Sequence, residues 1–170
     1  MHVTVTQTYD APVETVVAML ADVDFVRWRA DRSSGEGSVE QAEVAGTPAA
    51  GFTVSVRRTL PGAAIPAQAR ALVGDRLEVR QVEVWEAGVG PARAGTVTLE
   101  ISGAPVRLTG TLTLAETADG GTRQTYDGEV RASVPLFGAV VERAAADAVR
   151  DALAAEESAT REWIAQGTAP

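Results

Sequence analysis

One long helical segment at the C-terminal end constrains the fold of this chain more than any other feature. Pro135 suits the first turn of that helix, and the helical pattern continues to about Gly167. Its apolar side chains need a partner surface, which the inward face of a sheet supplies. The helix is rich in small residues, which let it approach the sheet closely or leave space unfilled beneath it. These residues include Ala144, Ala145, Ala148, Ala152 and Ala155.

Most of the chain before this helix has the two-residue periodicity of β-strands. The first segment, His2–Tyr9, places Gln7 on the same face as its valines, and threonines on the other face. Turn residues separate most of the later segments. These are Ser38–Val44, Phe52–Leu60, Leu77–Trp85, Gly95–Ser102, Val106–Leu114 and Arg123–Val134. The pattern predicts a curved antiparallel sheet of about seven strands, in which the last two form a hairpin.

Two short helices are predicted after the first strand. In residues 12–21, valines and a leucine recur at i, i+3, i+4 and i+7, and Pro12 suits the first helical turn. A second helical segment, Asp24–Ala30, carries Phe25 and Trp28 on one face and is expected to end at the polar turn 31–35. Prolines and a glycine limit residues 65–73 to one helical turn or a loop. The fold class is therefore α+β.

Composition limits the chemistry that is open to this chain. With 170 residues and 45% hydrophobic content, we expect one domain over residues 1–167 and a loose tail over 168–170. There is no cysteine, and the single histidine is His2, so no metal site and no cofactor are predicted. The net charge of −8 argues against nucleic acid as a partner. No segment has the pattern of a membrane span or a signal peptide, which predicts a cytoplasmic location.

The order of these elements and several local motifs resemble a known superfamily. The motifs are Tyr9-Asp10-Ala11-Pro12-Val13-Glu14, Trp28, Leu60-Pro61, Ile65-Pro66 and Glu83-Val84-Trp85. A strand, two short helices, six strands and one long helix are similar to the helix-grip fold of START-type lipid carriers, polyketide cyclases and pollen-allergen-like proteins, the SRPBCC type. The chain is most similar to an uncharacterised family of such proteins from high-GC bacteria. The resemblance implies an apolar cavity between the sheet and the terminal helix, and some members of the superfamily are enzymes.

Polar residues in phase with buried strand positions are the candidates for a site, because an unpartnered polar group in the core costs several kcal/mol. They are Gln7, Arg58, Gln81 and Glu83. Such residues either line a cavity and orient a ligand, or lie at the open end of the sheet or beyond a bulge. For Gln81 and Glu83 the second alternative is strong, since Val82 and Val84 occupy the opposite phase. Arg58 and Glu83 would form a neutralised pair if their strands place them together.

Aromatic residues and the charges of the last helix allow two interpretations each. Tyr9, Tyr126, Trp28 and Trp85 could line a ligand site, although aromatic residues on strands are more often core. Trp28 and Trp85 are expected to be buried, and Trp163 to be more exposed. The charged residues of the last helix are read as a solvated face, and they include Glu142, Asp147, Arg150, Glu156, Glu157 and Arg161.

These observations favour a protein that binds or carries a small hydrophobic molecule, such as a lipid, an isoprenoid or a polyketide-like compound, and that is monomeric or a weak homodimer. The alternatives are a cyclase or dehydratase acting on such a ligand, and a protein-interaction module whose cavity is filled. An enzyme is the less favoured reading, and no catalytic residue is assigned. The candidate ligand-binding residues are Arg58, Glu83, Tyr126, Trp85 and Tyr9.

Overall fold

Seven strands form one antiparallel sheet in the computed structural model, which describes residues 1–61, 76–88 and 90–167. The strands are β1 (His2–Tyr9), β2 (Ser38–Thr47), β3 (Gly51–Pro61), β4 (Arg76–Trp85), β5 (Ala92–Ile101), β6 (Val106–Glu116) and β7 (Thr122–Ala132). Their order is β1-β7-β6-β5-β4-β3-β2, so the first strand pairs with the last and leaves β1 and β2 as the two edges. The segment 65–73 and the tail 168–170, for which the sequence made predictions, lie outside the described residues.

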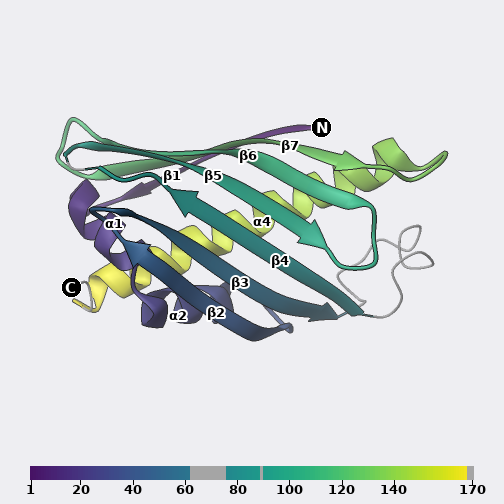
Figure 1. Cartoon of the computed structure of the whole chain (residues 1–170), viewed down its shortest axis with the longest axis horizontal. Helices are drawn as coiled ribbons and strands as arrows, with labels where there is room; N and C mark the ends of the chain where they lie inside the picture. The colour runs from purple at the N-terminus through teal and green to yellow at the C-terminus, as the bar shows by residue number, and fades with distance from the viewer. Residues whose placement is uncertain (62–75, 89, 168–170) are drawn as a thin grey trace.

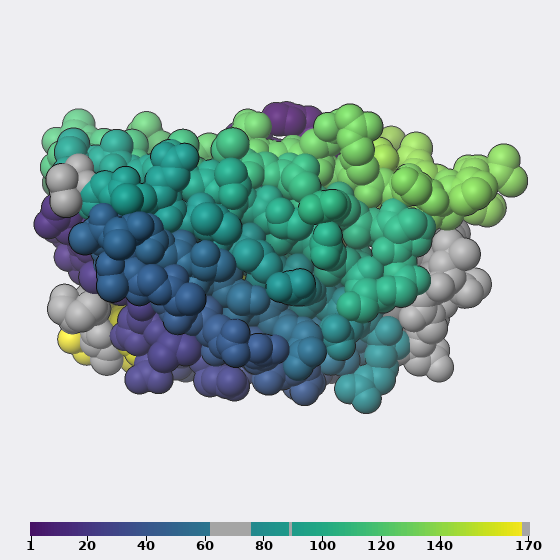
Figure 2. Space-filling model, in the orientation of Figure 1, coloured from purple at the N-terminus to yellow at the C-terminus, as the bar shows by residue number. Residues whose placement is uncertain are grey.

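Three helices are described, α1 (Val13–Leu20), α2 (Val23–Ser33) and α4 (Gly138–Ala165). Figure 1 shows α4 running across one face of the sheet, with α1 and α2 at the end where the C-terminus lies. Figure 2, in the same orientation, shows the outer face of the sheet, which is the face away from α4, and here the strands hide most of α4. This arrangement confirms the predicted helix-grip architecture.

Two predicted helix boundaries are wrong, for local reasons. The helix α2 continues through the expected polar turn to Ser33, because the hydroxyls of Ser33 and Ser34 donate hydrogen bonds to the Ala30 carbonyl at 3.2 and 2.7 Å. At the other end of the chain, α4 begins at Gly138 and not at Pro135. Leu136 has a φ of 66°, a left-handed conformation that an α-helix cannot contain.

The end of the interior beneath α1 and α2 is densely packed. Phe25 and Met19 are fully buried there, and the rings of Phe52 and Trp85 stack with centroids 6.2 Å apart. The sequence predicted that Trp28 is buried and that Trp163 is more exposed, and the structure does not show this difference between the two. The Trp163 ring packs 5.2 Å from the Trp28 ring, and both side chains are half-buried. The other end of the interior is different, because α4 presents small residues to the sheet.

Candidate ligand cavity and its polar wall

A cavity of about 200 Å³ lies between the sheet and α4. Its wall is predominantly apolar. The sheet contributes side chains of β3 to β7, and α4 contributes the alanines that the sequence marked as small. The α4 residues that line it are Val141, Ala144, Ala145, Ala148, Val149, Ala152, Leu153 and Glu156. Four of the five alanines therefore leave space unfilled, whereas Ala155 is not among the lining residues.

One end of this cavity is closed by polar side chains. Arg58, Gln81, Tyr126 and Glu156 are all buried and all belong to the cavity wall. The opposite end is bordered by apolar residues of the β5–β6 and β7–α4 turns, including Pro105 and Val134. The space therefore runs from a polar wall near the middle of the molecule to the turns at the far end of the sheet.

Arg58 and Glu156 of this polar wall form a buried charge cluster with Arg29 and Glu83, which do not line the cavity. The exposed fractions of Arg29, Arg58, Glu83 and Glu156 are 3%, 5%, 0% and 2%. Arg58 Nη2 lies 3.2 Å from Glu156 Oε1, and Arg29 Nη2 lies 3.7 Å from Glu83 Oε1. Arg29 Nε also lies 4.0 Å from Glu156 Oε2. The formal charges of the four side chains cancel, which is the condition under which buried charges are tolerated.

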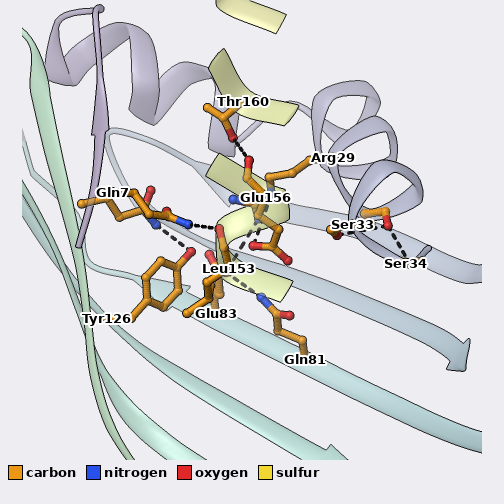
Figure 3. A network of polar contacts seen from close by, with 12 residues as sticks. Gln7, Arg29, Ser33, Ser34, Gln81, Glu83, Tyr126, Leu153, Glu156 and Thr160 are labelled. Atoms are coloured by element: carbon orange, nitrogen blue, oxygen red, sulfur yellow. Dashed lines mark hydrogen bonds and ion pairs between the residues drawn. The ribbon is translucent and has the colours of Figure 1, made fainter. Parts of the chain in front are cut away.

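Neutral side chains connect the charges. Arg58 Nη2 donates to Gln81 Oε1 at 2.9 Å, and Gln81 Nε2 donates to Glu83 Oε1 at the same distance. The Trp85 indole donates to Glu83 Oε2 at 3.1 Å, and Arg58 Nη1 donates to Ser33 Oγ at 3.2 Å. Figure 3 shows the network drawing together side chains of β1, α2, β4, β7 and α4. One network thus joins the helices α2 and α4 to the sheet.

A second branch of the network reaches the N-terminal strand. Tyr9 Oη donates to Gln7 Oε1 at 2.7 Å, and Gln7 Nε2 donates to the Leu153 carbonyl of α4 at 2.6 Å. On β7, Gln124 Nε2 donates to Tyr126 Oη at 2.8 Å. The Gln7 bond therefore anchors α4 to β1, and the Gln124 bond orients the Tyr126 hydroxyl on β7, the neighbour of β1 in the sheet.

Local sequence patterns explain how each charge becomes buried. On β3 and β4, Arg58 and Glu83 alternate in phase with buried valines, so their side chains point to the same face. On α2, Arg29 follows Phe25 by four residues and shares its buried face. On α4, Glu156 lies three residues after Leu153 and four before Thr160, both of which are buried.

Burial and the charge cluster shift several pKa values. Burial raises the pKa of Tyr9 above its usual value, and it raises the pKa of Tyr126 in the same direction, with the Glu83 carboxylate adding to the effect. Burial alone would lower the pKa of Arg29. The Glu156 and Glu83 carboxylates outweigh burial and raise that pKa, so Arg29 stays charged.

The tyrosines predict a distinctive alkaline titration. A raised pKa in the folded state stabilises the fold below about pH 10, the value for an unfolded tyrosine, and this contribution is lost as the pH rises further. The chain has two tyrosines, both buried. We expect absorbance at about 295 nm, which reports tyrosinate, to stay low while the protein is folded at about pH 11 and to rise when denaturant is added. A smooth rise centred near pH 10 in the folded protein would contradict the burial of both hydroxyls.

The candidate residues from the sequence fall into two groups. Arg58 and Tyr126 line the cavity. Glu83, Trp85 and Tyr9 are buried but are not among its lining residues, so the expected contact with the cavity is not observed for them. The pair of Arg58 with Glu83, which the sequence left conditional on their strands, is not among the described contacts: Gln81 lies between them, and Arg58 pairs with Glu156.

Sequence reasoning missed Arg29 and assigned Glu156 wrongly to a solvated helix face. Glu156 is 2% exposed and lines the cavity. The signal was present in the spacing, because Val149, Leu153, Glu156 and Thr160 recur at intervals of four, three and four residues along one face of α4. The alanines on every side of the helix obscured that stripe.

Comparison with known proteins places the chain in a family. The model of the family described as "Protein of unknown function (DUF2505)" matches residues 4–164. The chain belongs to this family. An uncharacterised protein of Mycobacterium tuberculosis and another of Mycobacterium bovis are each 27% identical to it over 164 residues, which cover 92% of this chain and 92% of each relative.

Solved structures support the fold at low sequence identity. A protein from Thermus thermophilus has a TM-score of 0.56 and 17% identity, covering 94% of this chain and 96% of its own. A START superfamily protein from Mycobacterium smegmatis has a TM-score of 0.55 and 12% identity over 96% and 98% of the two chains. A STAR-related lipid transfer protein from Xanthomonas axonopodis has a TM-score of 0.52 and 21% identity over 91% and 82%. The family therefore has the START-like helix-grip fold that the sequence predicted.

The described residues contain neither a membrane-spanning helix nor a metal-binding group of side chains. No helix among residues 1–61, 76–88 and 90–167 is long and apolar enough to cross a membrane. Within the same ranges, no group of histidine and carboxylate side chains could hold a metal ion.

Proposed function

We propose that the protein binds one small, uncharged, apolar molecule in the cavity beneath α4. The observation that carries this proposal is the cavity of about 200 Å³ whose floor is made by four alanines of α4. Larger side chains at these positions would fill the space, as in the close-packed interior of most proteins. An open apolar cavity in a START-like fold supports binding of a hydrophobic ligand over an interaction module with a filled interior.

The polar wall supports an uncharged ligand. The two arginines and two glutamates already neutralise one another, so a charged ligand would bring an uncompensated charge into a buried site. The polar wall also contains one hydrogen-bond donor that could bind a neutral oxygen atom of a ligand. Arg58 Nε is buried and makes no hydrogen bond to any residue that the structure describes. A hydroxyl or carbonyl group of the ligand could accept from it, with the apolar part of the ligand lying along the alanines.

An enzyme of the cyclase or dehydratase kind is the second candidate. The observation in its favour is that Glu156 lines the cavity and that its Oε2 accepts no hydrogen bond from the described residues. The same carboxylate is engaged by both Arg29 and Arg58, which gives it a structural partner on two sides. This arrangement favours binding over proton transfer.

Native mass spectrometry of protein purified from its own source, without denaturation, tests the proposed binding. We expect a species heavier than the bare chain by the mass of one neutral lipophilic molecule, and we expect that mass to disappear when the protein is denatured. The mass difference would identify the chemical class. Bare protein under gentle ionisation, with no lipophilic compound in an organic extract of the same sample, would contradict the proposal.

A further inference from the structure

Three large apolar side chains are exposed together where β7 turns into α4. The exposed fractions of Leu136, Phe137 and Val140 are 98%, 49% and 51%. Figures 1 and 2 show this green segment projecting from the body of the molecule, at the end of the sheet away from α1 and α2. Large apolar side chains grouped on a projecting turn mark a site of interaction.

The turn is held in this shape from both sides. Leu136 is the single non-glycine residue with a positive φ among those that the structure describes, a conformation that is strained for a bulky side chain. The Ser133 amide donates to the Pro105 carbonyl at 2.9 Å, and the Ala132 amide donates to Glu142 Oε1 at 3.1 Å. The exposed Leu136 side chain is therefore presented by an anchored turn and is not the result of a frayed end.

The start of α4 adds a polar feature to the same surface. Phe137 occupies the N-cap position, no side chain of the described residues caps the helix, and its first turn carries no carboxylate. The first amides of a helix without a cap favour an anion such as a phosphate group. Arg143 is exposed one turn further along, three residues after Val140. Exposed apolar side chains therefore lie next to backbone amides and an arginine that can bind a phosphate group. This combination matches the chemistry of a phospholipid.

We propose that the turn of residues 133–143, the β7–α4 tip, docks the protein on the surface of a phospholipid bilayer. Leu136, Phe137 and Val140 enter the apolar layer, and the start of α4 faces the phosphate groups. A second protein or a second copy of this chain fits less well, because three side chains supply far less than the roughly 800 Å² that each partner buries in a stable interface.

The tip also lies beside the cavity. Val134 and Val141, which belong to the tip, both line the cavity, as does Pro105, whose carbonyl accepts from the Ser133 amide. A docked molecule would therefore hold this end of the cavity against the bilayer, and an apolar ligand could exchange without crossing water. This last step rests on the proposed ligand binding, whereas docking itself does not.

Flotation with phosphatidylcholine vesicles tests the docking. We expect the wild-type protein to float with the vesicles, and the double variant Leu136→Ser/Phe137→Ser to lose at least about tenfold in partitioning, because its apolar contacts are removed. The matched control is Val23→Ser/Val84→Ser, which removes two side chains that are 43% and 45% exposed on other elements. We expect the control to partition like the wild type. Thermal unfolding of both variants should match the wild type, since all four side chains are exposed.

A reporter at the tip shows whether the side chains enter the bilayer. In a Phe137→Trp variant, the emission should shift to shorter wavelength with vesicles and be quenched by brominated acyl chains. Wild-type protein that does not float, or equal loss in the tip and control variants, would overturn the proposal. So would a tip variant that still floats but no longer self-associates in sedimentation, which would make the tip a protein interface. Native mass spectrometry of the tip variant keeps the two proposals apart, because ligand retention does not need the bilayer.

Discussion

Replacing Glu156 by alanine is expected to lower the free energy of unfolding by about 3–5 kcal/mol, because it leaves buried positive charge without its partner. Arg58 would lose its ion pair at 3.2 Å, and Arg29 would keep only Glu83. Urea unfolding followed by circular dichroism measures the change. The matched control is Asp147→Ala on the same helix, where an exposed pair with Arg150 contributes about 0.2–0.5 kcal/mol.

A double variant separates charge from packing. Arg58→Met/Glu156→Leu removes one charge of each sign and leaves Arg29 paired with Glu83. We therefore expect it to be closer to the wild type in stability than Glu156→Ala alone. Equal losses for Glu156→Ala and Asp147→Ala would show that the buried charges do not stabilise one another, and the account of the polar wall would be wrong.

The same substitution at two neighbouring alanines of α4 should have different effects, lowering ligand affinity at one and stability at the other. Ala145 lines the cavity, whereas Ala146 is fully buried and is not among the lining residues. Ala145→Phe should fill the cavity, lower the affinity for an apolar ligand by more than about tenfold and change stability by less than about 1 kcal/mol. Ala146→Phe should overpack a filled region and destabilise the fold by about 1–3 kcal/mol.

Thermal unfolding and titration with the neutral dye N-phenyl-1-naphthylamine measure these two effects separately. The opposite pattern, with Ala145→Phe strongly destabilised and still able to bind the dye, would place the open space somewhere else in the molecule.

The fold could be predicted from the sequence because its signals are local. Alternation in His2–Tyr9 and in the later strands identified the sheet, and the long segment after Pro135 identified the terminal helix. The boundaries were less certain, since they depend on single contacts such as the serine hydroxyls that extend α2 and the positive φ of Leu136 that delays α4.

The site could be predicted only in part, because it depends on distant segments meeting. The phase of Arg58 on its strand indicated burial, but nothing in the sequence states that α4 brings Glu156 to within 3.2 Å of it. The sequence left open whether Arg58 and Glu83 meet, and the structure places Gln81 between the two. Glu156 was assigned to the solvated face because alanines surround it on α4, and Arg29 was missed although it lies four residues after the buried Phe25.

A pair of related dyes tests most directly whether the cavity takes an uncharged apolar molecule. N-phenyl-1-naphthylamine is neutral, and 8-anilino-1-naphthalenesulfonate is nearly the same molecule with a negative charge. We expect the neutral dye to bind wild-type protein at one saturable site with micromolar affinity, largely independent of salt, and not to bind Ala145→Phe. The sulfonate should bind at least about tenfold more weakly, because the charge cluster already balances itself. No saturable binding of the neutral dye up to its solubility limit, or tighter binding of the sulfonate, would contradict the proposed binding.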